Sequence, residues 1–123
     1  MTDLFILEAS PKVKAKKPLE ADSLREVMMA LKTHELVAWC ERQNTGAAKV
    51  GDRFIKFGWK GCSDILGQLK DGRLLAVECK RLKGGKLTDE QTYFLEQVRQ
   101  HGGVSFVATN LHDVLNNLGA GHD

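Results

Sequence analysis

Two apolar stretches of the sequence, residues 63–69 and 74–80, flank the turn-forming sequence Lys70-Asp71-Gly72-Arg73. Short apolar runs on either side of a Gly-containing turn predict a β-hairpin. This hairpin carries three charged residues, Asp64, Glu78 and Lys80, among Leu, Ile, Val and Gly, where isolated charges are costly. We therefore expect the hairpin to hold a functional site around which the rest of the chain is organised.

The length of the loop decides which side chains of this hairpin meet, because opposed residues of an antiparallel pair point to the same face. A two-residue turn, Asp71-Gly72, pairs residues whose numbers sum to 143 and sends Asp64 and Glu78 to opposite faces. A three-residue loop with a left-handed Gly72 gives a sum of 142 and sets Asp64 across from Glu78. A Gly in the third loop position favours this second form, with the opposed Cβ atoms about 5 Å apart.

The alternation along residues 74–80 places Lys80 on the same face as Glu78. Paired carboxylates make an oxygen-rich site suited to Mg²⁺ or Mn²⁺, which polarises a phosphodiester and helps to generate hydroxide. A neighbouring lysine can orient the attacking water or stabilise charge in the transition state. Asp64, Glu78 and Lys80 therefore predict metal-assisted phosphodiester hydrolysis; the alternative is a strand-end cap at Asp64 beside an exposed ion pair.

The region before the hairpin predicts a helix and two strands. Apolar residues at helical spacing indicate a helix over about 18–33, and a start at Pro18 would let Glu20 continue its buried stripe. The sequence from Ser23 to Glu26 also spells a capping box, which would start the helix later and leave Glu20 outside it. Residues 36–42 and 54–57 have strand composition, and residues 43–46 form a turn-type cluster.

The region after the hairpin begins with a capping-box sequence at residues 88–91, which opens a helix whose buried stripe includes Gln91. Gly102 and Gly103 stop this helix, residues 104–108 predict a last strand, and residues 111–118 a terminal helix. Helices that alternate with strands in this order predict an α/β domain, with a mixed central β-sheet flanked by helices.

The composition is that of an ordinary globular domain. A chain of 123 residues, 42% apolar and 28% charged, is long enough for one domain, which we place at residues 18–119 between a basic arm at 1–17 and a tail at 120–123. No apolar run has the length of a bilayer span and no signal-peptide pattern begins the chain, so we expect a cytoplasmic protein without a membrane partner. Three cysteines without metal-type spacing are expected to be reduced and buried.

Basic residues bracket these motifs, although the net charge is only +2. They could contact phosphates or simply be solvated, as surface lysines usually are. Trp59 could belong to the core or to its rim. The basic residues concerned are Lys49, Arg53, Lys56, Lys60, Arg81, Lys83 and Lys86.

The ordered motifs resemble those of a known family. Glycines at 58 and 61 precede Asp64, Glu78-Cys79-Lys80 follow, and then come Leu87-Thr88-x-x-Gln91 and the Gly102-Gly103 stop. This set, which covers about residues 20–110, is similar to the VRR-Nuc branch of the PD-(D/E)xK nuclease superfamily. Ser63 stands where the name of the superfamily has Pro. The resemblance implies a restriction-endonuclease-like fold, a Mg²⁺ or Mn²⁺ cofactor and DNA cleavage.

The resemblance also implies roles for individual residues. Asp64, Glu78 and the main-chain carbonyl of Cys79 would bind the metal, and Lys80 would be the catalytic lysine. Two further active-site residues would be Gln91 and Glu20, the latter as a helix acid that also binds metal. Asn44, in a stretch similar to the family's, would lie near the substrate DNA. Among the basic residues that bracket the motifs, Lys60, Arg81 and Lys83 are our own candidates for contacting DNA.

Free-standing domains of this family and size resemble viral or bacterial Holliday-junction resolvases that act as homodimers. A symmetric dimer suits a four-way junction, because it presents two equivalent sites to strands related by two-fold symmetry. We therefore expect a homodimeric, structure-selective endonuclease acting on branched or duplex DNA. The alternatives are a flap or nicking nuclease of the same fold and a DNA-binding module without catalysis.

Overall fold

The structure is a computed structural model that describes residues 20–44, 46–80 and 85–119. Its centre is the hairpin of β4 (Ile65–Leu69) and β5 (Leu74–Cys79). Ile65 pairs with Val77 and Leu66 with Ala76, so the paired residue numbers sum to 142. The predicted three-residue loop and its register are therefore confirmed.

The geometry of the loop explains this register. The Leu69 N–H donates to the Arg73 carbonyl at 2.8 Å, and the Gly72 N–H donates to the Leu69 carbonyl at 2.8 Å. Gly72 has a φ of 99°, in the left-handed region where a side chain would be strained. A residue other than glycine here would favour a different loop, and a shift of one residue would exchange the two faces of β5.

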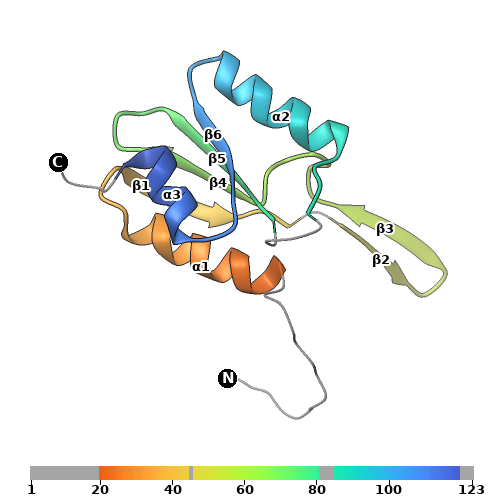
Figure 1. The fold of residues 1–123 in the computed structure, drawn as a ribbon. Helices are drawn as coiled ribbons and strands as arrows, with labels where there is room; N and C mark the ends of the chain where they lie inside the picture. Colours follow the sequence, from red (N-terminus) through yellow and green to blue (C-terminus); the bar gives the residue numbers. More distant parts are fainter. Residues whose placement is uncertain (1–19, 45, 81–84, 120–123) are drawn as a thin grey trace, which may run out of the picture.

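The hairpin lies in the middle of a mixed four-stranded sheet with the order β1-β4-β5-β6 (Figure 1). The edge strand β1 (Val37–Arg42) runs antiparallel to β4, and β6 (Val104–Ala108) runs parallel to β5 at the other edge. The expected α/β class with a mixed central sheet is confirmed. β5 is thus paired along both of its sides, and its residues from Leu75 to Cys79 are buried.

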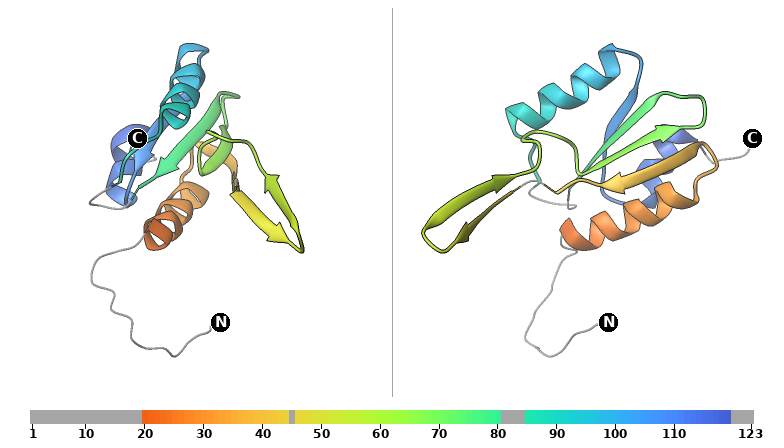
Figure 2. Two further views of the ribbon diagram at one scale, coloured as in Figure 1. Left: turned by 90° about the vertical axis from the view of Figure 1, so that its right-hand side faces the viewer. Right: turned by 180° about the vertical axis from the view of Figure 1, so that it is seen from behind.

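Helices cover both faces of this sheet (Figures 1 and 2). On one face lie α1 (Glu20–Thr33) and α3 (Leu111–Leu118), packed on the larger core cluster, and on the other lies α2 (Asp89–Gln100). Alternate residues of β5 enter the two clusters, with Leu75 and Val77 toward α1 and Ala76 toward α2. The predicted alternation is therefore confirmed.

The two capping boxes of the sequence have different outcomes. The later start of the first helix is wrong, because α1 already includes Glu20 and continues through Ser23, which is buried one turn before Val27. Burial on the core side of the helix outweighs the capping signal at Ser23. The expected start at Pro18 lies outside the described residues. The second capping box is confirmed, because Thr88 and Gln91 form both of its hydrogen bonds at the start of α2.

A second hairpin was only half expected. Residues 53–57 form β3 (Arg53–Phe57), near the predicted strand at 54–57, but β2 (Gly46–Val50) was not predicted. Val50 pairs with Arg53 across Gly51-Asp52, and Gly51 has a φ of 63°. This two-stranded sheet extends away from the main body (Figure 2).

Two predictions about composition can also be compared with the structure. The three cysteines, Cys40, Cys62 and Cys79, are free and buried, as expected. Within the described part of the chain, no helix is both long enough and apolar enough to cross a membrane. The arm at residues 1–17 and the tail at 120–123 lie outside the described residues.

Candidate active site

Asp64 and Glu78 are held by each other's strand. The Asp64 N–H donates to Glu78 Oε1 at 3.3 Å, and the Cys79 N–H donates to Asp64 Oδ2 at 2.8 Å. Each carboxylate therefore accepts a hydrogen bond from the main chain of the opposite strand, directly beyond the last β4–β5 pair. The register that the loop sets is what brings these two acids together.

Glu78 is the more buried of the two acids, with only 1% of its surface exposed. Burial, then the charge of Asp64 and then a hydrogen bond with the Asp64 side chain raise the pKa of Glu78 from 4.5 to about 8, against the opposing effect of Lys80. Desolvation disfavours the charged carboxylate, and a second acid at the same site disfavours it further. At neutral pH and without a cation, the pair therefore holds a proton that two solvated acids would have lost.

Two further predicted residues converge on Glu78. Lys80 Nζ lies 3.9 Å from Glu78 Oε2, and the Lys80 side chain is 17% exposed. Gln91 Nε2 donates to the same oxygen at 2.7 Å, while Gln91 Oε1 accepts from the Thr88 N–H at 2.9 Å. The capping box thus fixes the amide of Gln91 so that its NH₂ group faces Glu78. A single side chain joins the start of α2 to the acid pair.

A cavity of about 210 Å³ opens beside Asp64. Its lining includes Cys79, the residue whose carbonyl the resemblance assigns to the metal, and Arg42 from the end of β1. The first turn of α1 contributes Ala21 and Leu24. The cavity therefore lies where β1, β4, β5 and α1 meet, at one end of the sheet.

Glu20 was the least constrained of the predicted acids. It is the first residue of α1, and its neighbour Ala21 lines the cavity beside Asp64, so the backbone places position 20 next to the site. The Glu20 side chain lies outside the described residues. Glu26, a second acid of α1, accepts from the Leu111 N–H at 2.8 Å and so stabilises the start of α3.

Two of the four predicted DNA-contacting residues, Asn44 and Lys60, are described by the structure. Asn44 is exposed and follows Gln43, whose N–H donates to the Asp64 carbonyl at 2.7 Å. Lys60 lies on the connection from β3 to β4 and forms an exposed ion pair with Glu90, with 3.5 Å between Nζ and Oε2. Arg81 and Lys83 lie outside the described residues.

The structure describes residues 20–44, 46–80 and 85–119, without the side chain of Glu20. In this part of the chain, no three or more His, Cys, Asp or Glu side chains form a group that could hold a metal ion. The predicted ligand set is thus represented by the side chains of Asp64 and Glu78. These neighbouring acids are a suitable donor pair for a divalent cation, because its charge would offset both the burial and the charge of Asp64 that raise the pKa of Glu78.

The structure adds two residues that the sequence analysis did not assign to the site. Arg42 brings a cation to the cavity beside Asp64. Thr109 Oγ1 donates to the Lys80 carbonyl at 2.7 Å, while the Lys80 N–H donates to the Ala108 carbonyl at 3.2 Å, so the end of β6 fixes the backbone of Lys80. Both follow from strand pairing between segments far apart in sequence, and no local pattern marks them.

Comparisons of the chain with protein-family models, with curated proteins and with solved structures gave no match. The nuclease family therefore remains a resemblance carried by the motifs.

Proposed function

We propose that the protein is a metal-dependent, structure-selective DNA endonuclease with a PD-(D/E)xK fold of the VRR-Nuc type. The observation that supports this most directly is the reciprocal arrangement of Asp64 and Glu78, with Lys80 beside them. Burial of two acids would add little to the stability of the fold, because a buried charge is costly unless it is paired or binds a metal ion. An acid with a strongly raised pKa, such as Glu78, next to a second acid that lines a cavity is a common mark of catalytic sites.

The proposed metal is Mg²⁺ or Mn²⁺, held by Asp64 and Glu78 together with the carbonyl of Cys79. When bound, the ion would lower the pKa of a water molecule and polarise the phosphodiester. Glu78 would be ionised in that form, with Gln91 orienting it through the 2.7 Å hydrogen bond. Lys80 would orient the attacking water or neutralise charge that develops on the phosphate, and Arg42 would bind a phosphate at the cavity.

The test is a cleavage assay on four-way junction, flap, nicked and linear duplex DNA, with Mn²⁺ or with EDTA. We expect cleavage of branched DNA with Mn²⁺ and none with EDTA. Lys80→Ala should cleave about 10²–10³-fold more slowly, as for the loss of one electrostatic group in an active site, and should still bind the junction.

The substrate that is cleaved fastest decides between a junction resolvase and a flap or nicking nuclease. Lys70→Ala, which removes an exposed lysine from the β4–β5 loop, is the matched control and should cleave like the wild type. Equal inactivity of wild type and Lys80→Ala with Mn²⁺, together with retained binding, would overturn the nuclease and favour the DNA-binding module.

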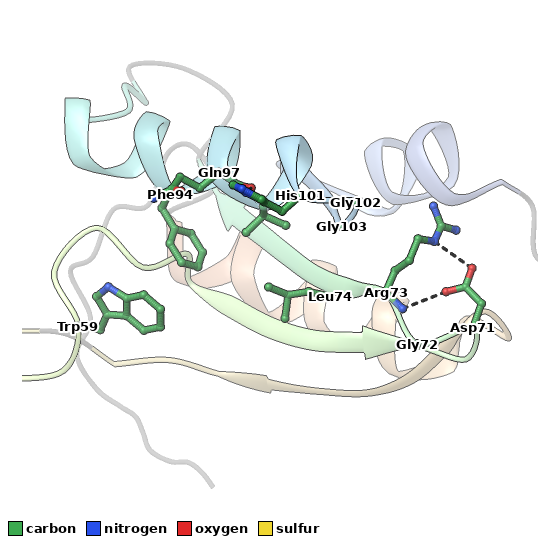
Figure 3. A pocket seen from close by; sticks show the side chains of 11 residues that line it. Trp59, Asp71, Gly72, Arg73, Leu74, Phe94, Gln97, His101, Gly102 and Gly103 are labelled. Carbon is green, nitrogen blue, oxygen red and sulfur yellow. Dashed lines mark hydrogen bonds and ion pairs between the residues drawn. The ribbon is translucent and has the colours of Figure 1, made fainter.

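We also propose that the active form is a homodimer, joined through the part of the α2 face of the sheet that α2 leaves open. A groove of about 550 Å³ runs there, lined by Trp59, Leu74 and Phe94 (Figure 3). Trp59 packs edge-on against Phe94, with 5.1 Å between ring centroids, yet remains 57% exposed, so it lies at the rim and not in the core. Trp39 of β1 is 49% exposed and extends this apolar surface. Its Nε1–H donates to Gln68 Oε1, and Gln68 is the residue of β4 that pairs with Leu74.

The area and the charges of this surface suit a second copy of the chain. Tyr93 lines an adjoining cavity together with Trp59 and Phe94. With roughly 200 Å² for a fully exposed aromatic side chain, the exposed parts of Trp39, Trp59 and Tyr93 amount to about 350 Å². That is a large share of the roughly 800 Å² that each partner contributes to a standard interface. An exposed ion pair borders each end of the groove, Asp71 with Arg73 and Lys60 with Glu90, so a two-fold axis can place cations opposite anions.

Sedimentation velocity tests the dimer separately from cleavage. We expect the wild type to sediment as a dimer and Leu74→Glu, which places a charge in the groove, to sediment as a monomer. Met29→Glu is the matched control, because Met29 is exposed on α1, on the other face of the sheet, and should leave the dimer intact. A monomeric wild type at micromolar concentration would overturn the dimer without bearing on the active site.

A further inference from the structure

The β2–β3 hairpin begins and ends at the carboxylate site. The chain leaves the main sheet after Arg42, and Gln43 donates its N–H to the Asp64 carbonyl at 2.7 Å. It returns through Ser63, whose Oγ donates to the Ile65 carbonyl at 2.7 Å and is buried. The segments that lead into and out of the hairpin are therefore both hydrogen-bonded to the start of β4, at Asp64 and Ile65. Figures 1 and 2 show the hairpin extending outward from this end of the sheet.

The strand pairing sorts the side chains of this hairpin into two faces. Lys49 pairs with Phe54 and Ala47 pairs with Lys56, so these four residues share one face. Phe54 is 69% exposed and lies between the two lysines. Arg53 lies on the opposite face, beside Val50 and Ile55. One face thus presents two cations around an aromatic ring, with only an alanine beside them.

The basic side chains of the hairpin have no ionic partner among the residues that the structure describes. Among the ion pairs of the described residues, none involves Lys49, Arg53 or Lys56, whereas Lys60 just after the hairpin pairs with Glu90. Charges alone could serve to keep an edge strand from pairing with other chains. That role does not account for a phenylalanine held in water between them, because an exposed aromatic ring favours the aggregation that such charges prevent.

We propose that the β2–β3 hairpin is a DNA-binding ribbon whose Lys49, Phe54 and Lys56 face lies in the major groove of B-form DNA. This inference rests on the proposed nuclease function and names the surface by which the substrate is held. The lysines bind phosphates on the two sides of the groove, and the phenylalanine contacts base edges or thymine methyl groups. A duplex held by the ribbon at this position presents its backbone to the carboxylate site at the base of the hairpin.

The dimensions agree with this occupant. Two paired strands lie about 4.8 Å apart, so a two-stranded ribbon fits into the major groove of B-DNA, which is about 12 Å wide. Its five-residue strands can follow the groove for about 17 Å. The major groove of an RNA duplex is deep and narrow and excludes such a ribbon. The ribbon is therefore specific for duplex DNA, and it contributes affinity more than sequence preference.

Binding measured without catalysis tests the proposal. Fluorescence anisotropy with a labelled DNA duplex in EDTA gives the dissociation constant of the full chain over a range of salt concentrations. We expect Lys49→Ala/Lys56→Ala to bind DNA at least about tenfold more weakly at about 0.1 M salt. The magnitude of the slope of log K against log salt concentration should fall by about 2, because two phosphate contacts are lost. Phe54→Ala should weaken binding about three- to tenfold and leave the slope unchanged.

Two controls separate a binding effect from a folding effect. Lys49→Arg/Lys56→Arg keeps both charges and should restore binding, and Lys70→Ala removes an exposed lysine from the other hairpin and should bind like the wild type. Circular dichroism should show the same thermal unfolding for all variants, because the substituted side chains are exposed.

Three outcomes would overturn the ribbon: a wild type that binds no duplex DNA, a double variant with the affinity and salt slope of Lys70→Ala, or an RNA duplex bound as tightly as DNA. Cleavage by the wild type with Mn²⁺ separates these outcomes from the nuclease proposal. An active wild type whose hairpin variants bind normally contradicts the ribbon alone, and a binding-competent but inactive wild type contradicts the nuclease alone.

Discussion

The chain contains two β-hairpins, each formed around a turn that contains a glycine. They differ in burial, because the tertiary structure covers one hairpin and leaves the other exposed. β4–β5 turns through a loop that ends at Gly72, lies between two other strands and is covered by helices on both faces. β2–β3 turns through Gly51-Asp52, pairs with no other strand and has exposed residues on both faces. Only the first is held by enough contacts to fix acids at hydrogen-bonding distance.

This difference indicates a division of labour. Catalysis needs side chains fixed to within a fraction of an ångström, which a buried central hairpin provides. An isolated two-stranded ribbon is marginally stable in water and adapts its shape to a partner at low cost. The site and the proposed DNA contact are therefore built from the same type of motif under different degrees of burial.

The largest expected contrast is in stability. Leu75→Ala in β5 removes a fully buried side chain from the larger core and should lower the free energy of unfolding by about 2–5 kcal/mol. Ile55→Ala, in the middle of β3, removes a side chain that is 40% exposed and should cost less than about 1 kcal/mol. Urea unfolding measures both, and equal losses would contradict the contrast between the hairpins.

The pH dependence of stability should arise in the buried hairpin. The pKa of Glu78 is about 8 in the folded chain and 4.5 ordinarily, so between these values the folded form binds more protons than the unfolded form. In EDTA, stability should therefore fall as pH rises from about 5 to 8, by at most about 5 kcal/mol and by less where water relaxes around the charge.

Glu78→Gln tests this assignment, because it stays neutral and should flatten the dependence across that window. The measurement is the free energy of unfolding from urea titrations at pH 5, 6.5 and 8. A wild type whose stability rises over this range would show that Glu78 is ionised in the folded chain without metal.

The smallest expected effect is at the link between α2 and the site. Gln91→Ala removes a hydrogen bond to Glu78 and half of the capping box, and should cost about 1–3 kcal/mol. Thr88→Ala removes the other half of the box, without contact to Glu78, and should cost about 1 kcal/mol. Gln91→Ala should have the lower midpoint of thermal unfolding, because only Gln91 also contacts Glu78. Identical midpoints would mean that Gln91 acts only as a helix cap.

Much of the buried hairpin was predictable because its determinants are local. The third-position Gly72 sets the register, the alternation sets the faces, and the Thr88–Gln91 box sets the start of α2. The exchange of hydrogen bonds between Asp64, Glu78 and the opposing backbones could not be deduced, because it depends on where the pairing of β4 with β5 ends.

β2 was missed for a physical reason. Its sequence, Gly-Ala-Ala-Lys-Val, has a single β-branched residue, so it owes its strand conformation to pairing with β3 and not to its own propensity. The Gly51-Asp52 pair just after it was the available signal, since Gly-Asp between two runs favours a two-residue hairpin turn. The start of α1 shows the opposite case, in which burial of Ser23 outweighed a clear local motif.

The hydrogen bonds from the Asp64 N–H to Glu78 and from the Cys79 N–H to Asp64 make the proposed chemistry inseparable from correct assembly of β4 and β5. A molecule in which β4 and β5 were joined one residue out of step would lose both bonds at once, and with them any place for an ion. Under the proposed function, the cleavage activity per milligram would therefore measure the fraction of correctly assembled molecules. For the same reason, isosteric amides are better choices than alanine for silencing these acids, since an amide can still accept the bond that aligns the strands.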